Sequence, residues 1–267
     1  MVKLHMNDIQ NYWELIIFEK TYHLSPYLIL NGIGLIIGLL LLDKKLNKTF
    51  NKNSDKIYII FVFSIVFGWI GAHVFDVIAK KQVLGHAGFT FLGGLIFGAA
   101  FFVIIFVRYY NTHKLLTALN VVVTPLILGH AIGRIGCYFS GCCYGTVIDH
   151  SNYLSLFFLR HPTQIYESIF LFLLFAFLNL KEKMQFQISN IYIYLVIYGV
   201  WKFLIEFLRG DYRGQHLGGL SPSQWISLFI IFCICLFLII KASKKNLTNH
   251  SSGHRGLKRS EWSITRF

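Results

Sequence analysis

Residues 57–78 read IYIIFVFSIVFGWIGAHVFDVI, an apolar run that contains one charged residue, Asp76. About 20 apolar residues are enough to cross a bilayer as a helix. Six similar runs lie elsewhere in the chain, so we expect an all-α integral membrane protein with about seven transmembrane helices. The expected spans are roughly 26–42, 57–78, 88–107, 115–139, 163–180, 189–208 and 222–241.

Composition supports a membrane protein and excludes several other classes. Of the 267 residues, 55% are hydrophobic and 14% are charged, whereas soluble domains carry about 25% charged residues. The chain therefore has too little polar surface for an ordinary cytosolic enzyme, a disordered protein or a disulfide-stapled secreted domain. Its formal net charge of +13 would suggest nucleic acid as the partner of a soluble protein. We expect no nucleic acid here, because basic residues accumulate on the cytoplasmic side of membrane proteins.

The chain divides into three parts. Residues 1–25 mix charged and apolar side chains and lack the charged start and cleavage site of a signal peptide, so we expect an amphipathic arm in the membrane interface. Residues 26–241 form the seven-helix membrane domain. Residues 242–267 are rich in Lys, Ser and Asn, which predicts a disordered basic tail.

Basic residues in the loops predict the orientation. One side of the membrane would hold the C-terminal tail and the loops on its side, among them residues 43–56, with sixteen Lys and Arg in total. The opposite side would hold seven. This asymmetry predicts an N-terminus outside and a C-terminus in the cytoplasm. We therefore expect a multi-pass membrane protein whose basic loops lie in the cytoplasm.

This orientation collects the unusual ends of the spans on the outer face. The polar, Gly-rich and Cys-rich stretches are 88–94, 133–145, 161–167, 206–211 and 221–224. Polar residues with only structural roles would be scattered among both ends of the spans. We therefore expect a site that opens to the outer leaflet or to the periplasmic space.

Four charged residues at these span ends need an explanation, because charge is costly inside an apolar span. Arg134 lies inside an apolar span, where it either extends to the interface or binds an anionic headgroup, since guanidinium matches phosphate geometry. Glu206 and Arg209 share a helical face and could form a local ion pair. Glu167 lies more than a turn inside the span that starts after His161, so it requires a partner.

Three cysteines, Cys137, Cys142 and Cys143, lie close together in the sequence near the outer face. Two of them could form a disulfide in an oxidising compartment. A thiolate activated by Arg134 is a second alternative, because a neighbouring cation lowers a thiol pKa. A zinc site is a third alternative, although no fourth ligand stands at a diagnostic spacing.

Several pairs of glycines are four residues apart, including Gly34 with Gly38 and Gly94 with Gly98. This spacing lets helices approach closely, and packing is the default explanation for Gly34 with Gly38 and for Gly129 with Gly133. The Gly93-Gly94 pair lies beside the predicted membrane face. It could instead admit an acyl chain or a headgroup.

At these residues the sequence resembles the prolipoprotein diacylglyceryl transferases, seven-span enzymes of the bacterial inner membrane. The resemblance covers the spans from about residue 22 to 241. The matching stretches are Gly93-Gly94-Leu95-Ile96, Gly133-Arg134-Ile135-Gly136, His161-Pro162-Thr163-Gln164-Ile165-Tyr166-Glu167, Glu206-Phe207-Leu208-Arg209 and Gln224. The resemblance implies transfer of a diacylglyceryl group from phosphatidylglycerol to the lipobox cysteine of a preprolipoprotein, with release of glycerol phosphate.

Three positions depart from the family pattern. Leu92 stands where the family has a histidine before Gly-Gly, Cys137 where it has Asn, and Cys142 where it has a glutamate. If the chemistry is shared, two arginines hold the leaving phosphate and a base takes the proton of the incoming thiol. The resemblance implies no metal and no other cofactor.

The resemblance and the residues together give the candidate site. The candidate catalytic residues are Arg134, Arg209, His161, Glu167, Glu206 and Cys142. The candidate residues for phosphatidylglycerol, or for another anionic phospholipid, are Arg134, Gly93, Gly94, Gly136, Gly145, Tyr166 and Gln164. Two other functions remain open: a non-catalytic or altered-specificity relative that binds lipid or lipoprotein, and a small transporter. A transporter should show internal symmetry and polar residues near the bilayer midplane, and neither is clear here.

Overall fold

A computed structural model gives the fold of the chain. It describes residues 13–17, 20–80, 91–149, 153–184, 188–211 and 217–261. The helices are α1 (Pro26–Phe50), α2 (Ser54–Lys80), α3 (Phe91–Tyr109), α4 (Thr112–Phe139), α5 (Thr163–Lys183), α6 (Asn190–Ile205) and α7 (Pro222–Glu261). Short 3-10 helices occupy Asn51–Asn53 (η1), Tyr153–Leu156 (η3) and Glu206–Leu208 (η4). Each helix overlaps one predicted span, so the predicted helical class is confirmed.

Five segments of the described residues are long and apolar enough to cross a membrane. They are Pro26–Ile78, Lys114–Phe139, Thr163–Lys183, Asn190–Leu208 and Pro222–Ile240, and Gly93–Tyr109 is a shorter apolar helix. The first segment contains both α1 and α2, which η1 separates. Large apolar side chains such as Leu40, Ile104 and Phe229 are about two-thirds exposed on the outside of the bundle. Such an apolar surface is unfavourable in water, and the hydrocarbon core of a bilayer would cover it.

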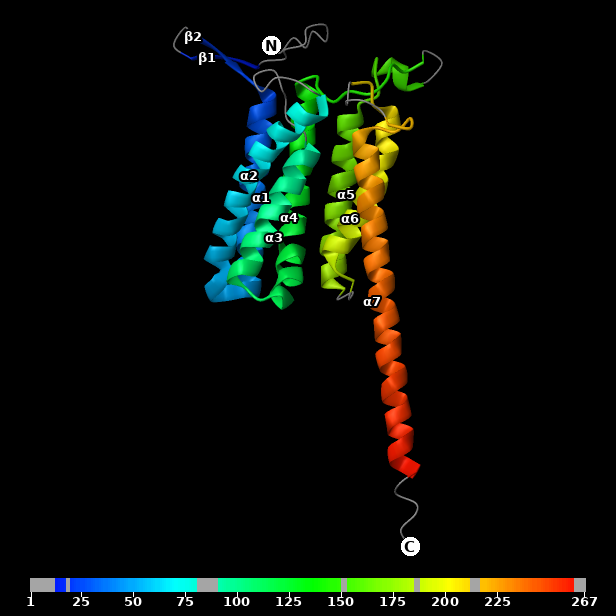
Figure 1. Ribbon diagram of the computed structural model, residues 1–267. Coiled ribbons are helices and arrows are strands. Elements are labelled where there is room, and N and C mark those ends of the chain that lie inside the picture. Colours follow the sequence, from blue (N-terminus) through cyan, green and yellow to red (C-terminus); the bar gives the residue numbers. More distant parts are fainter. Residues whose placement is uncertain are drawn as a thin grey trace.

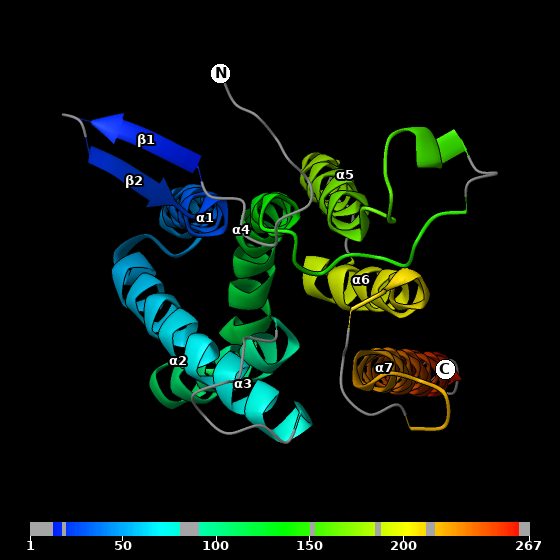
Figure 2. The same ribbon diagram turned by 90° about the horizontal axis from the view of Figure 1, so that it is seen from above.

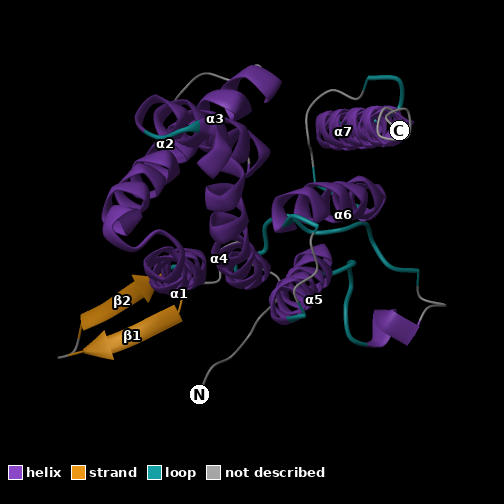
Figure 3. Ribbon diagram, turned by 90° about the horizontal axis from the view of Figure 1, so that it is seen from below, coloured by secondary structure: helices purple, strands orange, loops and turns teal. Residues whose placement is uncertain are grey.

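A two-stranded antiparallel sheet precedes the helices, which the all-helical prediction did not include. Strand β1 (Trp13–Ile17) pairs with β2 (Lys20–Leu24), and Trp13 lies opposite Leu24. Trp, Ile, Thr and Tyr favour extended backbone, which explains strands in this segment. Figure 3 shows the sheet beside α1. Residues 1–12 of the expected arm lie outside the described part of the chain.

Two helix boundaries differ from the sequence prediction. Helix α1 continues to Phe50, into the segment predicted as a loop from residue 43, because this segment has no Pro or Gly and its Leu46 is fully buried. The turn that follows uses a positive φ of 48° at Asn51, a residue type that tolerates it. Helix α7 continues to Glu261, through the predicted disordered tail, and its second half extends away from the bundle (Figure 1).

Glycines bring two pairs of helices into close contact. A Cβ on Gly34 of α1 would lie 2.7 Å from the carbonyl oxygen of Gly129 in α4, and a Cβ on Gly68 of α2 would lie 2.9 Å from the carbonyl oxygen of Gly94 in α3. The packing explanation is therefore confirmed for Gly34 and for Gly129, and Gly94 also packs closely on its neighbouring helix. Gly94 faces α2 at this contact, so its backbone is not open to a lipid there.

Helix α4 is the central helix of the bundle, as the view in Figure 2 shows. One buried apolar cluster joins its N-terminal half to α1, α2 and α3 around Leu42 and Phe106. A second cluster joins its C-terminal half to α5 and α6 around Leu171 and Tyr194. The end of α4 therefore lies where both groups of helices meet.

The ends of α4 and α6 and the starts of α5 and α7 lie at the same end of the bundle, at the top in Figure 1. We call this the site end. Backbone bridges tie its connections together, because Gly145 pairs with Arg209 and Val147 pairs with Arg160. This arrangement confirms that the stretches 133–145, 161–167, 206–211 and 221–224 collect at one end of the bundle, whereas residues 88–90 of the fifth stretch lie outside the described part of the chain.

Candidate active site

Glu167 lies at the centre of a buried ionic network between α4, α5 and α6. It is 1% exposed, and its Oε2 accepts a 2.5 Å hydrogen bond from Nη2 of Arg134. Its Oε1 accepts a 2.9 Å hydrogen bond from the hydroxyl of Tyr198. Lys202 Nζ and His130 Nε2 each lie 3.8 Å from the carboxylate. The predicted need of Glu167 for a partner is confirmed, and both of its oxygens already accept hydrogen bonds.

The same network holds Arg134 in place. Arg134 is 7% exposed and therefore does not extend into the interface. Its Nη1 lies 4.0 Å from Sγ of Cys137, and its Nε has no hydrogen-bond partner. A buried guanidinium is stable in an apolar span only when its charge is paired, and Glu167 supplies that charge. Arg134 thus uses only one of its three guanidinium nitrogens, Nη2, to contact Glu167.

Lys202 connects this network to a second acidic residue, Glu206. Its Nζ lies 3.7 Å from Oε2 of Glu206, which also accepts a 3.2 Å hydrogen bond at Oε1 from Ser221 at the start of α7. Tyr198, Lys202 and Glu206 are four residues apart along the chain and share one helical face. Sequence reasoning missed Tyr198 and Lys202, and this spacing was the signal that could have found them.

Arg209 pairs with Asp211 and not with Glu206. Its Nε and Nη2 donate hydrogen bonds of 2.8 and 2.9 Å to the two carboxylate oxygens of Asp211. The local pair with Glu206, which the sequence left open, is not the one that forms, because η4 ends at Leu208, so that Arg209 has extended backbone with ψ of 135° and helical spacing no longer applies. Burial raises the pKa of Asp211 above its usual value, although the Arg209 guanidinium opposes this shift. Sequence reasoning did not select Asp211.

A cavity of about 220 Å³ opens beside this pair. Its lining residues are Glu206, Phe207, Arg209, Asp211, Gly219, Ser221 and Gln224. Arg209 is 9% exposed, and its Nη1 is buried without a hydrogen-bond partner. A buried donor that lacks an acceptor is costly, and an anion bound in the cavity would supply the acceptor.

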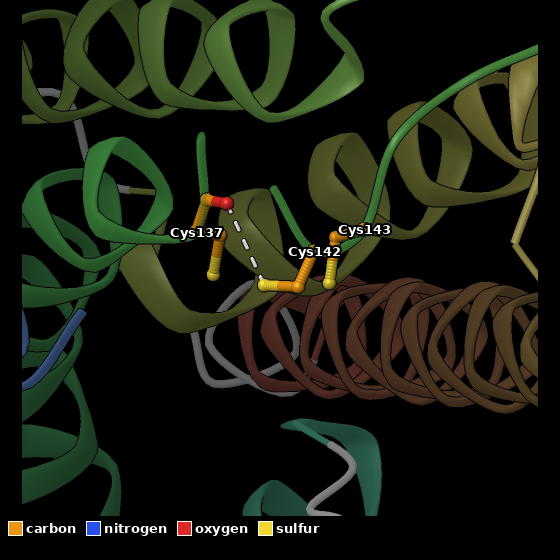
Figure 4. Close-up of side chains that lie close together, drawn as sticks. All are labelled: Cys137, Cys142 and Cys143. Atoms are coloured by element: carbon orange, nitrogen blue, oxygen red, sulfur yellow. Dashed lines mark hydrogen bonds between the residues drawn. The ribbon is translucent and has the colours of Figure 1, made fainter. Parts of the chain in front are cut away.

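The three cysteines converge at the end of α4 (Figure 4). The Sγ atoms of Cys137, Cys142 and Cys143 all lie within 4.8 Å of one another, and all three are free thiols. Cys142 Sγ donates a 3.5 Å hydrogen bond to the carbonyl oxygen of Cys137. The pKa of the Cys143 thiol is held well below its usual value by hydrogen bonds from the other two thiols and by the charges of Arg134 and Arg209. The pKa of Cys142 is raised, because its hydrogen bonds to the neighbouring sulfurs stabilise the protonated form.

The first turn of α5 fixes the backbone of the two adjacent cysteines. Thr163 donates a 2.8 Å hydrogen bond from Oγ1 to the carbonyl oxygen of Cys143, and Gln164 donates a 2.5 Å bond from Nε2 to that of Cys142. Gln164 is 3% exposed. Gln164, predicted to bind phosphatidylglycerol, therefore holds the cysteine turn in place.

The remaining predicted residues lie around the same end. Gly145 allows two segments of the chain to approach closely, because a Cβ at this position would lie 2.6 Å from the Cβ of His161. His161 lies with its Nδ1 3.5 Å from the hydroxyl of Tyr166. Gly136 packs on α1, and Gly93 is buried at the start of α3. Leu92 belongs to the first turn of α3, and its side chain lies outside the described part of the structure.

Comparison with known proteins finds relatives that match most of the chain. A sequence family described as prolipoprotein diacylglyceryl transferase matches residues 15–240. A protein of Clostridium tetani named phosphatidylglycerol–prolipoprotein diacylglyceryl transferase is 34% identical over 232 residues, covering 80% of this chain and 92% of that protein. A relative of Clostridium perfringens, named as transferase 2 of the same kind, is 31% identical over 75% of this chain and 84% of its own length. A third, from Clostridium novyi, is 31% identical over 80% of this chain and 91% of its own length.

Proposed function

This chain belongs to the prolipoprotein diacylglyceryl transferase family and is a transferase of lipoprotein biosynthesis, and we propose that it works at the site end of its bundle. There it moves the diacylglyceryl group of phosphatidylglycerol onto the lipobox cysteine of a preprolipoprotein. The observation that carries this placement is Arg209, whose buried Nη1 has no partner beside a cavity of about 220 Å³. A phosphodiester oxygen fits such a donor.

Asp211 prepares Arg209 for this role. The bidentate contact uses Nε and Nη2 and fixes the plane of the guanidinium, which leaves Nη1 for the phosphate. Ser221 and Gln224 line the same cavity, and their side chains brace its wall through hydrogen bonds to Glu206 and to the backbone of residues 203 and 221. A guanidinium that is oriented before the lipid binds stabilises the charge that develops on the leaving phosphate.

Arg134 supplies a second positive charge deeper in the bundle. Glu167 holds it through Nη2, Nη1 lies 4.0 Å from Sγ of Cys137, and Nε remains without a hydrogen-bond partner for the reacting groups. In the transfer, the cysteine sulfur attacks an sp³ carbon of the diacylglyceryl group and the carbon–oxygen bond to phosphate breaks. The electron pair passes to the phosphate oxygen, and glycerol phosphate leaves.

The thiol must also lose its proton, and three of the candidate catalytic residues could act as the base. Glu167 has both oxygens engaged by hydrogen bonds. Glu206 lines the cavity and has one oxygen, Oε2, without a hydrogen bond. His161 is half-buried near Tyr166. This geometry favours Glu206 and His161 over Glu167 as proton acceptors, and leaves Glu167 to position Arg134.

The membrane arrangement belongs to the same proposal. We place all seven helices across the cytoplasmic membrane of a bacterium, with the N-terminus outside and the C-terminus inside. The basic asymmetry of the loops supports this orientation. Under it the site end faces outward, where exported preprolipoproteins arrive, and the three predicted parts of the chain are an interfacial arm, a membrane domain and a cytoplasmic basic extension.

Arg209→Ala tests the proposal, with Arg160→Ala as the matched control. Arg160 is an exposed arginine at the same end, and its guanidinium lies 4.9 Å from the ring centre of Tyr144, away from the cavity residues. We expect Arg209→Ala to lose binding of phosphatidylglycerol and transfer to a lipobox peptide, and Arg209→Lys to restore them only in part. Arg160→Ala should retain both. Folded Arg209→Ala that transfers at the wild-type rate would contradict the placement. Lipid binding by wild type without any transfer would favour the non-catalytic alternative.

A further inference from the structure

We propose that Cys137, Cys142 and Cys143 form a three-thiolate site for a thiophilic divalent cation of the Zn²⁺ type. The three sulfurs lie within 4.8 Å of one another. Zinc–thiolate bonds of about 2.3 Å around a tetrahedral ion place sulfurs about 3.8 Å apart, so a small contraction would seat one ion. A disulfide would instead need two sulfurs at about 2.05 Å and would leave the third unused.

The backbone supports convergence of all three thiols. Cys143 has a positive φ of 62°, which is costly for a residue with a Cβ, and Gly141 has a φ of 64° just before it. Thr163 and Gln164 hold this turn through the carbonyl oxygens of Cys143 and Cys142. Strained backbone that the surroundings fix in this way is characteristic of functional sites. Figure 4 shows the three sulfur atoms gathered together in the resulting turn.

The surroundings also suit the charge of such a site. Three thiolates and one divalent cation carry a net charge of −1. Arg134 Nη1, 4.0 Å from Sγ of Cys137, offsets that charge. Within the described residues the group contains the three cysteines and no His, Asp or Glu. Three protein ligands leave the fourth position of a tetrahedral zinc open, as in catalytic sites.

This inference rests on the proposed transferase function and gives the open position a use. The acceptor of the transfer is itself a thiol, and a thiol that coordinates zinc is deprotonated at neutral pH. The lipobox cysteine would bind as a thiolate in the fourth position, and its proton would pass to water by way of the acceptor proposed above, Glu206 or His161. Its sulfur then forms the bond to the diacylglyceryl carbon, while the carbon–oxygen bond breaks and glycerol phosphate leaves toward Arg209. The thioether product is a weaker ligand and dissociates.

The proposal also accounts for two departures from the family pattern together. The resemblance implies a histidine where Leu92 stands and a glutamate where Cys142 stands. A metal-bound thiol has a lowered pKa and therefore does not need a histidine at position 92 to take its proton. This differs from the expectation that no metal takes part, which came from the resemblance and not from the cysteines.

Metal content and Co²⁺ spectroscopy of the purified full-length protein test the site without relying on activity. We expect one Zn²⁺ per chain after equilibration, and a sulfur-to-cobalt charge-transfer band when Co²⁺ replaces it. Each of Cys137→Ser, Cys142→Ser and Cys143→Ser should lose the band. The matched control is Cys233→Ser/Cys235→Ser, because these exposed cysteines lie on α7 away from the group, and it should keep the band. A peptide with a lipobox cysteine should shift the Co²⁺ spectrum, and the same peptide with serine should not.

Several results would overturn the metal site. These are folded wild type that binds no Zn²⁺, a triple Cys→Ser variant that keeps the metal, or protein purified without reductant that contains a disulfide among the three cysteines. Full transfer by metal-free protein would also overturn it and leave the transferase function intact. Conversely, Co²⁺ bound by the three thiols in a protein that transfers nothing would remove the transferase function while the metal site stands. Thermal unfolding of each variant identifies protein that has simply failed to fold.

Discussion

The Arg134–Glu167 pair should contribute strongly to stability, and Glu167→Gln measures that contribution. The substitution keeps the shape of the side chain and an oxygen for Tyr198, but it removes the charge that two buried cations face. Removing one partner of a buried pair costs about 3–5 kcal/mol. At about 1.4 kcal/mol per factor of ten, that lowers the folding equilibrium constant roughly 10²- to 10⁴-fold.

Glu182→Gln is the matched control for this experiment. Glu182 also pairs with a cation, Lys45, at 3.0 Å, but its side chain is 40% exposed. An exposed pair contributes about 0–1 kcal/mol. Unfolding in increasing SDS, followed by helical circular dichroism, compares both variants with wild type. Equal stability of the two variants would refute the reasoning, and so would an Arg134→Gln/Glu167→Gln double variant whose loss equals the sum of the two single losses.

Three further predictions use other parts of the molecule. In metal-free protein the lowered pKa of Cys143 keeps its thiolate as the pH falls below the usual thiol pKa of about 8.5, so iodoacetamide at pH 7 should label Cys143 before Cys142; mass spectrometry showing Cys142 labelled first would contradict this. Gly34→Ala should destabilise by about 1–3 kcal/mol, because its Cβ would lie 2.7 Å from a backbone oxygen of α4, whereas Gly32→Ala has nothing within 4 Å and should be neutral in the same SDS titration. In a cysteine-free background, Lys52→Cys should react with an impermeant maleimide only after cells are opened, and labelling of intact cells would reverse the orientation.

The helices could be predicted because long apolar runs in the sequence mark them. The starts of α5 and α7 fall at residues 163 and 222, as predicted. The end of α1 was missed because the charged segment after residue 42 still favours a helix, and hydrophobicity records only where the apolar run stops. The strands at 13–24 were missed because a short segment of mixed polarity gives no clear period.

The site was only partly predictable, for reasons that lie in its connections. Helical spacing could place Lys202 beside Glu206, since both share a face of α6 and its extension. It could not give Arg209 its partner Asp211, because the chain is extended there. The convergence of the three thiols depends on the positive φ of Cys143, and a spacing pattern contains no backbone angle.

Transfer to a synthetic lipobox peptide is the most direct test of the central claim. The wild-type protein would be reconstituted in phosphatidylglycerol vesicles with the peptide, and the peptide mass and the released glycerol phosphate would be measured together. The account predicts that the peptide gains one diacylglyceryl group at its cysteine, that an equal amount of glycerol phosphate appears, and that a cysteine-to-serine peptide gains nothing. An unmodified cysteine peptide in the presence of folded, lipid-bound and metal-loaded protein would contradict it.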